Sequence, residues 1–203
     1  VMSELKRKKK KSSKLLIFFK ILFVLFLLLL MVTISGLTAY YALTRDLPGI
    51  DALKDYRPSI ASCVYDANDV LLEEFFLEDR KIIPISEVPD LVKYAFVAAE
   101  DSRFYQHQGF DPVSIFRAMF KNVEAGKIVQ GGSTITQQVA KMMYLTPERK
   151  YIRKFKEAVL SYRIDRYLTK DEILYLYLNQ IYMGHGTYGI ESASIGYFGK
   201  SAK

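Results

Sequence analysis

The hydrophobic pattern begins with a long apolar segment at residues 15–41, within which residues 21–31 are apolar without interruption. About twenty such residues in a helix cross the roughly 30 Å hydrocarbon core of a bilayer. A cleaved signal peptide is the alternative, because Ala39-Tyr40-Tyr41-Ala42 resembles a cleavage site. The apolar core of a signal peptide is usually shorter, about 7–15 residues, so the pattern favours an uncleaved transmembrane anchor.

The pattern changes after the anchor. Residues 42–60 are more polar and contain Pro48-Gly49 and Pro58, which predicts a juxtamembrane stalk. Residues 62–76 alternate around an Asn68-Asp69 turn and predict a small β-hairpin. Residues 80–85 predict one more short strand.

From Pro89 onward, regular apolar spacing and capping signals predict helices. The clearest starts are Asp111 followed by Pro112, and the capping box formed by Thr169 and Glu172. One predicted helix ends at Glu100. Four more run from Pro112 to Gly126, from Ser133 or Thr134 to about Leu145, from Arg149 to Leu168 and from Lys170 to Tyr182. A short helix follows a loop at residues 184–189. We therefore expect a mainly α-helical domain over residues 61–203 with a small N-terminal β element. Its end soon after a helix suggests part of a longer protein.

The net charge of +7 is concentrated at the amino terminus. Residues 1–14 contain seven Lys and Arg and one acidic residue, which leaves +1 for the rest of the chain. This distribution argues against a nucleic-acid-binding surface. A basic tail before a membrane span predicts a cytoplasmic amino terminus, and hence an extracytoplasmic domain after a single-pass anchor in the cytoplasmic (inner) membrane. Cys63 is the only cysteine in the sequence, which excludes an internal disulfide and a zinc cluster of several cysteines.

The candidate chemistry lies in the helical part. Glu100 and Asp101 stand where a helix ends, and a polar segment at residues 131–138 follows about thirty residues later. Several cations come next, at Lys141 and over residues 149–156. A carboxylate can accept a proton as a general base, and Lys and Arg form strong charge-assisted bonds with phosphate oxygens. These residues suit a reaction with an anionic diphosphate leaving group.

Five motifs in order resemble the signatures of the family-51 peptidoglycan glycosyltransferases. They are Glu100-Asp101-x-x-Phe104-x-x-His107-x-Gly109, Gly132-x-Thr134-Ile135-Thr136-Gln137-Gln138 with Lys141, Arg153-Lys154-x-x-Glu157, Lys170-x-x-Ile173-Leu174-x-x-Tyr177-Leu178-Asn179, and Ala193-x-x-x-Tyr197-Phe198-Gly199-Lys200. With the anchor, stalk and β element before them, they resemble the N-terminal part of a class A penicillin-binding protein.

The resemblance implies a lysozyme-like helical fold and inverting polymerisation of lipid II into β-1,4-linked glycan strands, with release of undecaprenyl diphosphate. Its catalytic residues would be Glu100, as the general base, and Glu157. Glu157 lies four residues after Arg153. The alternative to a catalytic role for Glu157 is therefore an ordinary helical ion pair with Arg153, worth roughly 0.3–0.5 kcal/mol.

The same resemblance implies a substrate-binding set. Its members are Asp101, Phe104, His107, Ser133, Thr134, Gln137, Gln138, Lys141, Arg149, Arg153 and Lys154. Helix capping or solvent exposure is the alternative for most of them, and His107 is interpreted as bonding the loop that holds Glu100. Asp101 either supports Glu100 or attracts a divalent cation, Mg²⁺ or Mn²⁺. No organic cofactor is expected, and the expected partners are lipid II, the growing glycan strand, the cytoplasmic membrane and other cell-wall synthesis proteins.

Two other functions remain open at this point. A lysozyme-like muramidase or lytic transglycosylase also uses a Glu after a helix, but it gives no reason for the cations or the anchor. A non-catalytic, membrane-tethered module that binds lipid II is the other.

A further hypothesis concerns the apolar residues between Phe110 and Val129, among them Phe116, Met119 and Phe120. They are interspersed with cations, a composition typical of a segment that dips into a lipid leaflet. An ordinary core helix is the alternative.

Overall fold

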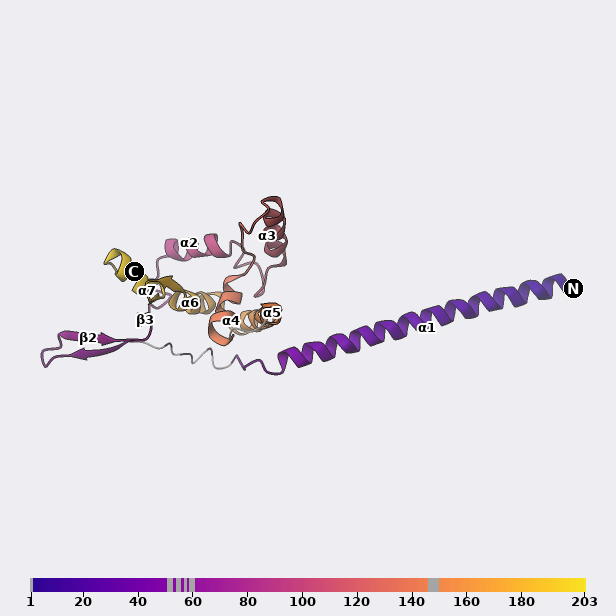
Figure 1. Ribbon diagram of the computed structural model, residues 1–203, viewed down its shortest axis with the longest axis horizontal. Coiled ribbons are helices and arrows are strands. Elements are labelled where there is room, and N and C mark those ends of the chain that lie inside the picture. The colour runs from indigo at the N-terminus through magenta and orange to yellow at the C-terminus, as the bar shows by residue number, and fades with distance from the viewer. Residues whose placement is uncertain (1, 51–52, 54–55, 57, 59–60, 146–149) are drawn as a thin grey trace. The chain divides into compact units, whose positions relative to one another are not determined.

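The computed structural model describes residues 2–50, 53, 56, 58, 61–145 and 150–203 (Figure 1). It divides into two compact units, Val1–Asp46 and Leu47–Lys203. Arg149, which the sequence places in the substrate-binding set, lies outside the described residues.

The first unit is the helix α1 (Met2–Thr44). Its Leu16–Thr44 part is long and apolar enough to cross a membrane, by length and composition. Three hydroxyl groups within it donate to carbonyl oxygens of the preceding turn, each at 2.8 Å: Thr33 to Leu30, Thr38 to Ile34 and Thr44 to Tyr40. These bonds lower the cost of placing hydroxyls in an apolar medium.

The predicted hairpin is present as β1 (Ser62–Tyr65) and β2 (Leu71–Phe75), which pair antiparallel. Asp66 shapes the turn, because its Oδ1 accepts hydrogen bonds from the backbone N–H groups of Asn68 and Val70, both at 2.8 Å. Asp69 takes a positive φ of 61°, which short polar residues tolerate. The hairpin is thus determined by local residues.

A second small sheet was only partly predicted. It consists of β3 (Asp79–Arg80), β4 (Tyr182–Gly184) and β5 (Thr187–Tyr188), with β5 in the middle. The helix expected to reach Tyr182 ends earlier, because Tyr182 pairs with Tyr188 across this sheet. The strand expected at residues 80–85 is likewise shorter and lies earlier.

The helices confirm a mainly α-helical fold. They are α2 (Asp90–Glu100), α3 (Pro112–Glu124), α4 (Ile135–Tyr144), α5 (Lys150–Tyr167), α6 (Lys170–Gln180) and α7 (Ile190–Phe198). Asp111 caps α3 by accepting from Val113 N at 2.9 Å. Thr134 and Thr169 form capping boxes with Gln137 and Glu172 at the starts of α4 and α6. Each of these side chains satisfies N–H groups that a helix start leaves free.

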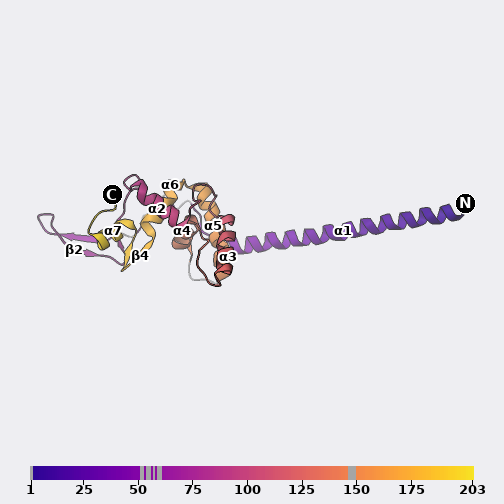
Figure 2. The ribbon, with the colours of Figure 1, turned by 90° about the horizontal axis from the view of Figure 1, so that it is seen from above.

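The core lies around α4, α5 and α6. Its fully buried side chains include Ile135, Val139, Leu160, Ile164, Ile173, Leu174 and Tyr177. Leu53, from the segment assigned to the stalk, is also buried in this core. Within this unit, α3 lies at the end away from the β1–β2 hairpin in both views (Figures 1 and 2).

Candidate functional site

Glu100 is the last residue of α2, and its side chain faces the start of α4. Gln138 Nε2 donates to Glu100 Oε2 at 2.9 Å. Both line a cleft of about 390 Å³. One carboxylate oxygen is thereby oriented by Gln138, and the other is not engaged by that bond.

Asp101 also lines this cleft, whereas His107 does not. His107 Nε2 lies 2.8 Å from Asp101 Oδ2, and Ile135 N donates to the same oxygen at 3.1 Å. Their side chains are only 2% and 4% exposed, for Asp101 and His107 in that order. Asp101 therefore joins the end of α2 to the first residue of α4 and so supports Glu100. His107 bonds to Asp101, the residue after Glu100, which agrees with its interpretation as a residue that holds the loop.

These contacts bear on the possible divalent cation. Asp101 uses one carboxylate oxygen within the protein. Among the described residues, no group of three or more His, Cys, Asp or Glu side chains is placed to hold a metal ion. These contacts give Asp101 a supporting position behind Glu100, and the divalent cation stays a prediction.

The start of α4 is held by buried polar contacts. Thr134 Oγ1 donates to the Gly109 carbonyl at 2.6 Å and accepts from Gln137 N at 3.1 Å. Gly109 has a φ of +84°, and a Cβ there would collide with the backbone of Ser161 on α5. Glycine is therefore required where the loop after α2 crosses α5.

A second cleft, of about 480 Å³, carries the cations. It is lined by Ser133, Gln137, Gln138, Lys141, Tyr151, Arg153, Lys154 and Glu157. Lys154 Nζ contacts Glu157 Oε2 at 2.7 Å and Ser133 Oγ at 2.8 Å. Arg153 Nε lies 3.5 Å from Glu157 Oε1. Three cations and one buried carboxylate line this cleft, so it favours an anionic group.

The two clefts adjoin, because Ser133 and Gln138 line both. A proton acceptor on one side thus lies beside an anion-binding surface on the other. Arg117 also lines the first cleft, although the sequence reasoning did not include it among the site residues. One feature of the sequence could have indicated it. Arg117 lies on the helix that Asp111 caps, three residues after Ser114, which also lines the cleft.

Phe104 lines neither cleft. Its side chain is fully buried, and Lys170 Nζ lies 4.7 Å from the centre of its ring. Lys170 also donates to the His107 carbonyl at 2.8 Å and to Asp165 Oδ2 at 2.6 Å. Phe104 therefore stabilises the loop after Glu100 and has no surface to offer a substrate.

Tyr177 on α6 lies in the core, close enough to Glu100 for the charge of that carboxylate to affect the Tyr177 pKa. Burial, and then the negative charge of Glu100, raises the pKa of the Tyr177 phenol well above its usual range. Its ring packs edge-on against Phe96 of α2, with 6.2 Å between the ring centres. Phe96 precedes Glu100 by one helical turn, so Tyr177 supports the part of α2 that presents the carboxylate.

Comparison with known proteins matches this architecture to a family. A family model described as Transglycosylase matches residues 68–203, more than half of the chain. Penicillin-binding protein 1A of Aquifex aeolicus is 49% identical over 156 residues, which are 77% of this chain and 22% of that protein. Penicillin-binding protein 1A of Escherichia coli is 45% identical over 169 residues, 83% of this chain and 20% of that protein.

The chain thus spans about a fifth of the length of these relatives. The family match confirms the resemblance inferred from the five signatures. The first three of those signatures contribute ten of the twenty residues that line the two adjoining clefts. This chain belongs to the transglycosylase family.

Proposed function

We propose that this chain is the peptidoglycan glycosyltransferase part of a longer class A penicillin-binding protein. It would polymerise lipid II into β-1,4-linked glycan strands and release undecaprenyl diphosphate. The observation that carries the proposal is the pair of clefts joined at Ser133 and Gln138, with Glu100 in one and three cations in the other.

The reaction follows from this arrangement. The acceptor sugar hydroxyl binds beside Glu100, which removes its proton while the hydroxyl oxygen attacks the anomeric carbon of the donor. The bond from that carbon to the diphosphate oxygen breaks, and the new glycosidic bond forms on the opposite face. The diphosphate leaves as an anion, so it needs the cations Lys141, Arg153 and Lys154 rather than a proton donor.

Glu157 has a role in this scheme through its neighbours. It is 4% exposed and contacts both Arg153 and Lys154. We assign it the task of holding these two cations in position for the diphosphate. A helical ion pair on an exposed surface would not need such burial.

The geometry favours transfer over the two other functions. A retaining or inverting glycosidase needs a second carboxyl group beside the scissile bond as general acid. Glu157 lies in the other cleft and is neutralised by two cations. A binding module would need no proton acceptor beside the anion site. Incubation with lipid II separates a polymerase, which makes long strands, from a binding module, which leaves the substrate unchanged. Incubation with preformed glycan strands identifies a muramidase by its clipped products.

The decisive variant is Glu100→Gln, which keeps the size of the side chain and removes the base. We expect strand formation to fall by about 100-fold or more, within the usual range for a general base, while binding of lipid II stays nearly unchanged. Glu124→Gln is the matched control, because Glu124 is exposed at the end of α3 and lines neither cleft. Strand formation by both variants should be measured in this chain and in the full-length protein. Wild-type turnover by Glu100→Gln would remove Glu100 from this role.

The proposed location is the outer side of the cytoplasmic membrane. The apolar helix α1 supplies the anchor, and the basic residues 1–14 favour a cytoplasmic amino terminus. A divalent cation beside Asp101 stays a prediction. Strand formation in the presence of EDTA tests it, with added Mg²⁺ or Mn²⁺ as the rescue.

A further inference from the structure

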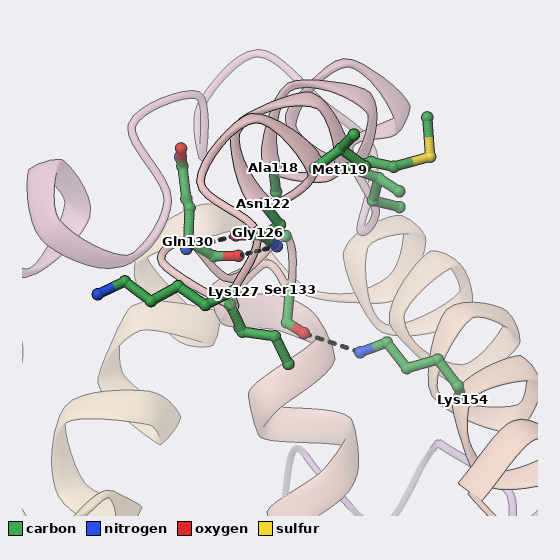
Figure 3. Close-up of a pocket in the computed structure, with 12 residues that line it drawn as sticks. Ala118, Met119, Asn122, Gly126, Lys127, Gln130, Ser133 and Lys154 are labelled. Carbon is green, nitrogen blue, oxygen red and sulfur yellow. Dashed lines mark hydrogen bonds between the residues drawn. The ribbon is translucent and has the colours of Figure 1, made fainter.

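Two loops contribute to the cleft that holds Glu100, and they are held in different ways. Residues 98–102 and residues 129–134 both line this cleft. The second loop is fastened by its own neighbouring helix, because Asn122 Oδ1 accepts from Gln130 N at 2.9 Å and Asn122 Nδ2 donates to Gln130 O at 3.0 Å (Figure 3). Asn122 Oδ1 also accepts from Val129 N at 2.8 Å. These bonds are local, since they join residues seven or eight positions apart.

The loop at residues 101–109, which follows Glu100, is contacted by a charged side chain from a distant helix. Lys170 is the first residue of α6, and its Nζ donates to the His107 carbonyl at 2.8 Å. The same Nζ lies 4.7 Å from the centre of the Phe104 ring. Lys170 therefore contacts this loop through one hydrogen bond and one cation–π contact.

The ammonium group of Lys170 is also tied to the other helices. It contacts Asp165 Oδ2 on α5 at 2.6 Å, and Thr136 Oγ1 on α4 donates to that oxygen at 3.3 Å. The side chains of Lys170 and Asp165 are 23% and 6% exposed, so solvent ions screen this pair only partly. The loop after Glu100 is thus connected through Lys170 to α4, α5 and α6.

Lys170 occupies an unfavourable place for a cation. The first turn of a helix carries a partial positive charge that favours acidic residues, and Asp171 and Glu172 follow this rule in α6. Lys170 breaks the rule and is compensated by its tertiary contacts. Sequences break such local rules mainly at sites where function depends on the arrangement.

The contacts of Lys170 extend to Glu100 through two residues. The imidazole of His107 lies 2.8 Å from Asp101 Oδ2, and Asp101 directly follows Glu100. A shift of the His107 backbone would therefore move the end of α2, which presents the Glu100 carboxylate to the cleft.

We propose that Lys170 is a positioning residue for the general base. It holds the His107 carbonyl against α5 and so keeps Glu100 beside Gln138, where the carboxylate faces the acceptor hydroxyl. The inference rests on the proposed function and adds to it a residue that lines neither cleft. Lys170 acts on the reaction through His107 and Asp101 and does not contact the substrate.

The test is Lys170→Met, which keeps the apolar part of the side chain and removes the ammonium group. The kcat for strand formation from lipid II should fall about tenfold or more, because a small misplacement of a catalytic group is costly. The KM for lipid II should change by less than about twofold, because the cations of the second cleft stay in place. Lys170→Arg keeps a charged donor and should recover part of the lost kcat.

A second variant covers the stability of the fold. Lys170→Met leaves the buried Asp165 carboxylate without this partner, whereas Lys170→Met with Asp165→Asn removes both charges. The double variant carries the test if circular dichroism shows that the single variant is unfolded. Arg166→Met is the matched control, because Arg166 is exposed, donates to Tyr162 and lines neither cleft. It should keep the wild-type kcat.

Two readings separate positioning from a general loss of stability. Positioning matters only when the base is present, so Lys170→Met should slow the residual turnover of Glu100→Gln by less than about twofold. Hydrogen–deuterium exchange needs no activity. Amides of residues 101–109 should exchange faster in Lys170→Met than in the wild type, while those of residues 129–130, which Asn122 holds, should be unchanged.

Three results would overturn the proposal. They are a wild-type kcat in the folded Lys170 variant, an equal loss in the wild-type and Glu100→Gln backgrounds, and unchanged exchange at residues 101–109. The proposed function fails separately. It is rejected if the wild-type protein makes no strands from lipid II, and its base is rejected if Glu100→Gln has normal turnover. A wild-type kcat in Lys170→Met beside an inactive Glu100→Gln would reject only the positioning role.

Discussion

The helices α3 and α4 have similar apolar spacing and opposite surroundings. In α4, five residues are buried, and the helix packs against α5 and α6. In α3, all of whose residues the structure describes, Ala118 alone is buried. Apolar periodicity therefore identifies the apolar side of a helix but not what covers that side. A neighbouring helix, a ligand or a membrane can cover it.

The two helices are consequently held by different forces. Burial of side chains such as Ile135 and Val139 stabilises α4. In α3, polar contacts act at the two ends, through Asp111 at the start and Asn122 near the finish. The following predictions change one kind of contact at a time.

The largest effect is expected from Ile135→Ala in α4. Ile135 is fully buried, so the substitution should lower the free energy of unfolding by about 3 kcal/mol through lost burial and a cavity. The matched change in α3 is Ile115→Ala, where the side chain is 42% exposed and the loss should be about 1 kcal/mol. Urea unfolding followed by circular dichroism measures both, and equal losses would contradict the contrast between the helices.

Asp111→Ala should cost about 1–2 kcal/mol at pH 7 by removing the cap of α3. Burial raises the pKa of the Asp111 carboxyl, but hydrogen bonds from Ser114, the charge of Arg103 and the bond from Val113 outweigh it, so the net pKa lies below its ordinary value. A lowered pKa stabilises the folded state above the unfolded pKa of about 4, and this contribution is lost as the pH falls through the folded value.

The difference between wild type and Asp111→Ala should therefore be present at pH 7 and shrink as the pH falls below about 4. Urea unfolding over that range measures it. Asp111→Asn keeps the cap without the charge and separates the two contributions. A difference that does not vary with pH would assign the whole effect to the cap.

Tyr177→Phe should change the stability by less than about 1 kcal/mol at pH 7, toward greater stability. Its hydroxyl is buried and has no hydrogen-bond partner among the described residues, so the protein loses no bond when it is removed. Because the pKa of Tyr177 is raised, the wild type should lose stability as the pH rises above about 10, where the unfolded phenol ionises. Unfolding of both proteins at neutral and alkaline pH should show this loss in the wild type and less of it in the variant.

The smallest effect on stability is expected from the double variant Phe116→Ser and Phe120→Ser. Both side chains are exposed, so the free energy of unfolding should change by no more than about 0.5 kcal/mol. If α3 dips into the outer leaflet, liposome binding by residues 47–203 alone should nevertheless weaken. Unchanged sedimentation with liposomes would argue that this apolar side of α3 contacts another protein instead.

Local signals made much of the fold predictable. The starts of α3, α4 and α6 follow from Asp111, Thr134 and Thr169, because a cap depends on residues within one turn. The β1–β2 hairpin follows from the turn at Asp66, for the same reason. The end of α6 did not follow, because it depends on a sheet that β3 joins from about a hundred residues earlier in the chain.

The signatures contain many of the residues that line the two clefts, but they do not give the arrangement of those residues. The signatures contain Phe104 and His107 beside Glu100, yet these two support the loop from behind. Arg117 belongs to no signature and lines the cleft of Glu100. A linear motif does not say which of its members faces the substrate, because that depends on helices that pack from elsewhere in the chain.

By itself, the sequence determined the apolar span, the helical class, the capped helix starts and the family. All of these depend on composition or on neighbours within a few residues. Only the tertiary structure decided that Ser133 lies where the two clefts meet, and that Glu157 is buried between two cations. Those relations depend on contacts between α2, α3, α4 and α5, and packing free energy selects such contacts over the whole domain rather than along the chain.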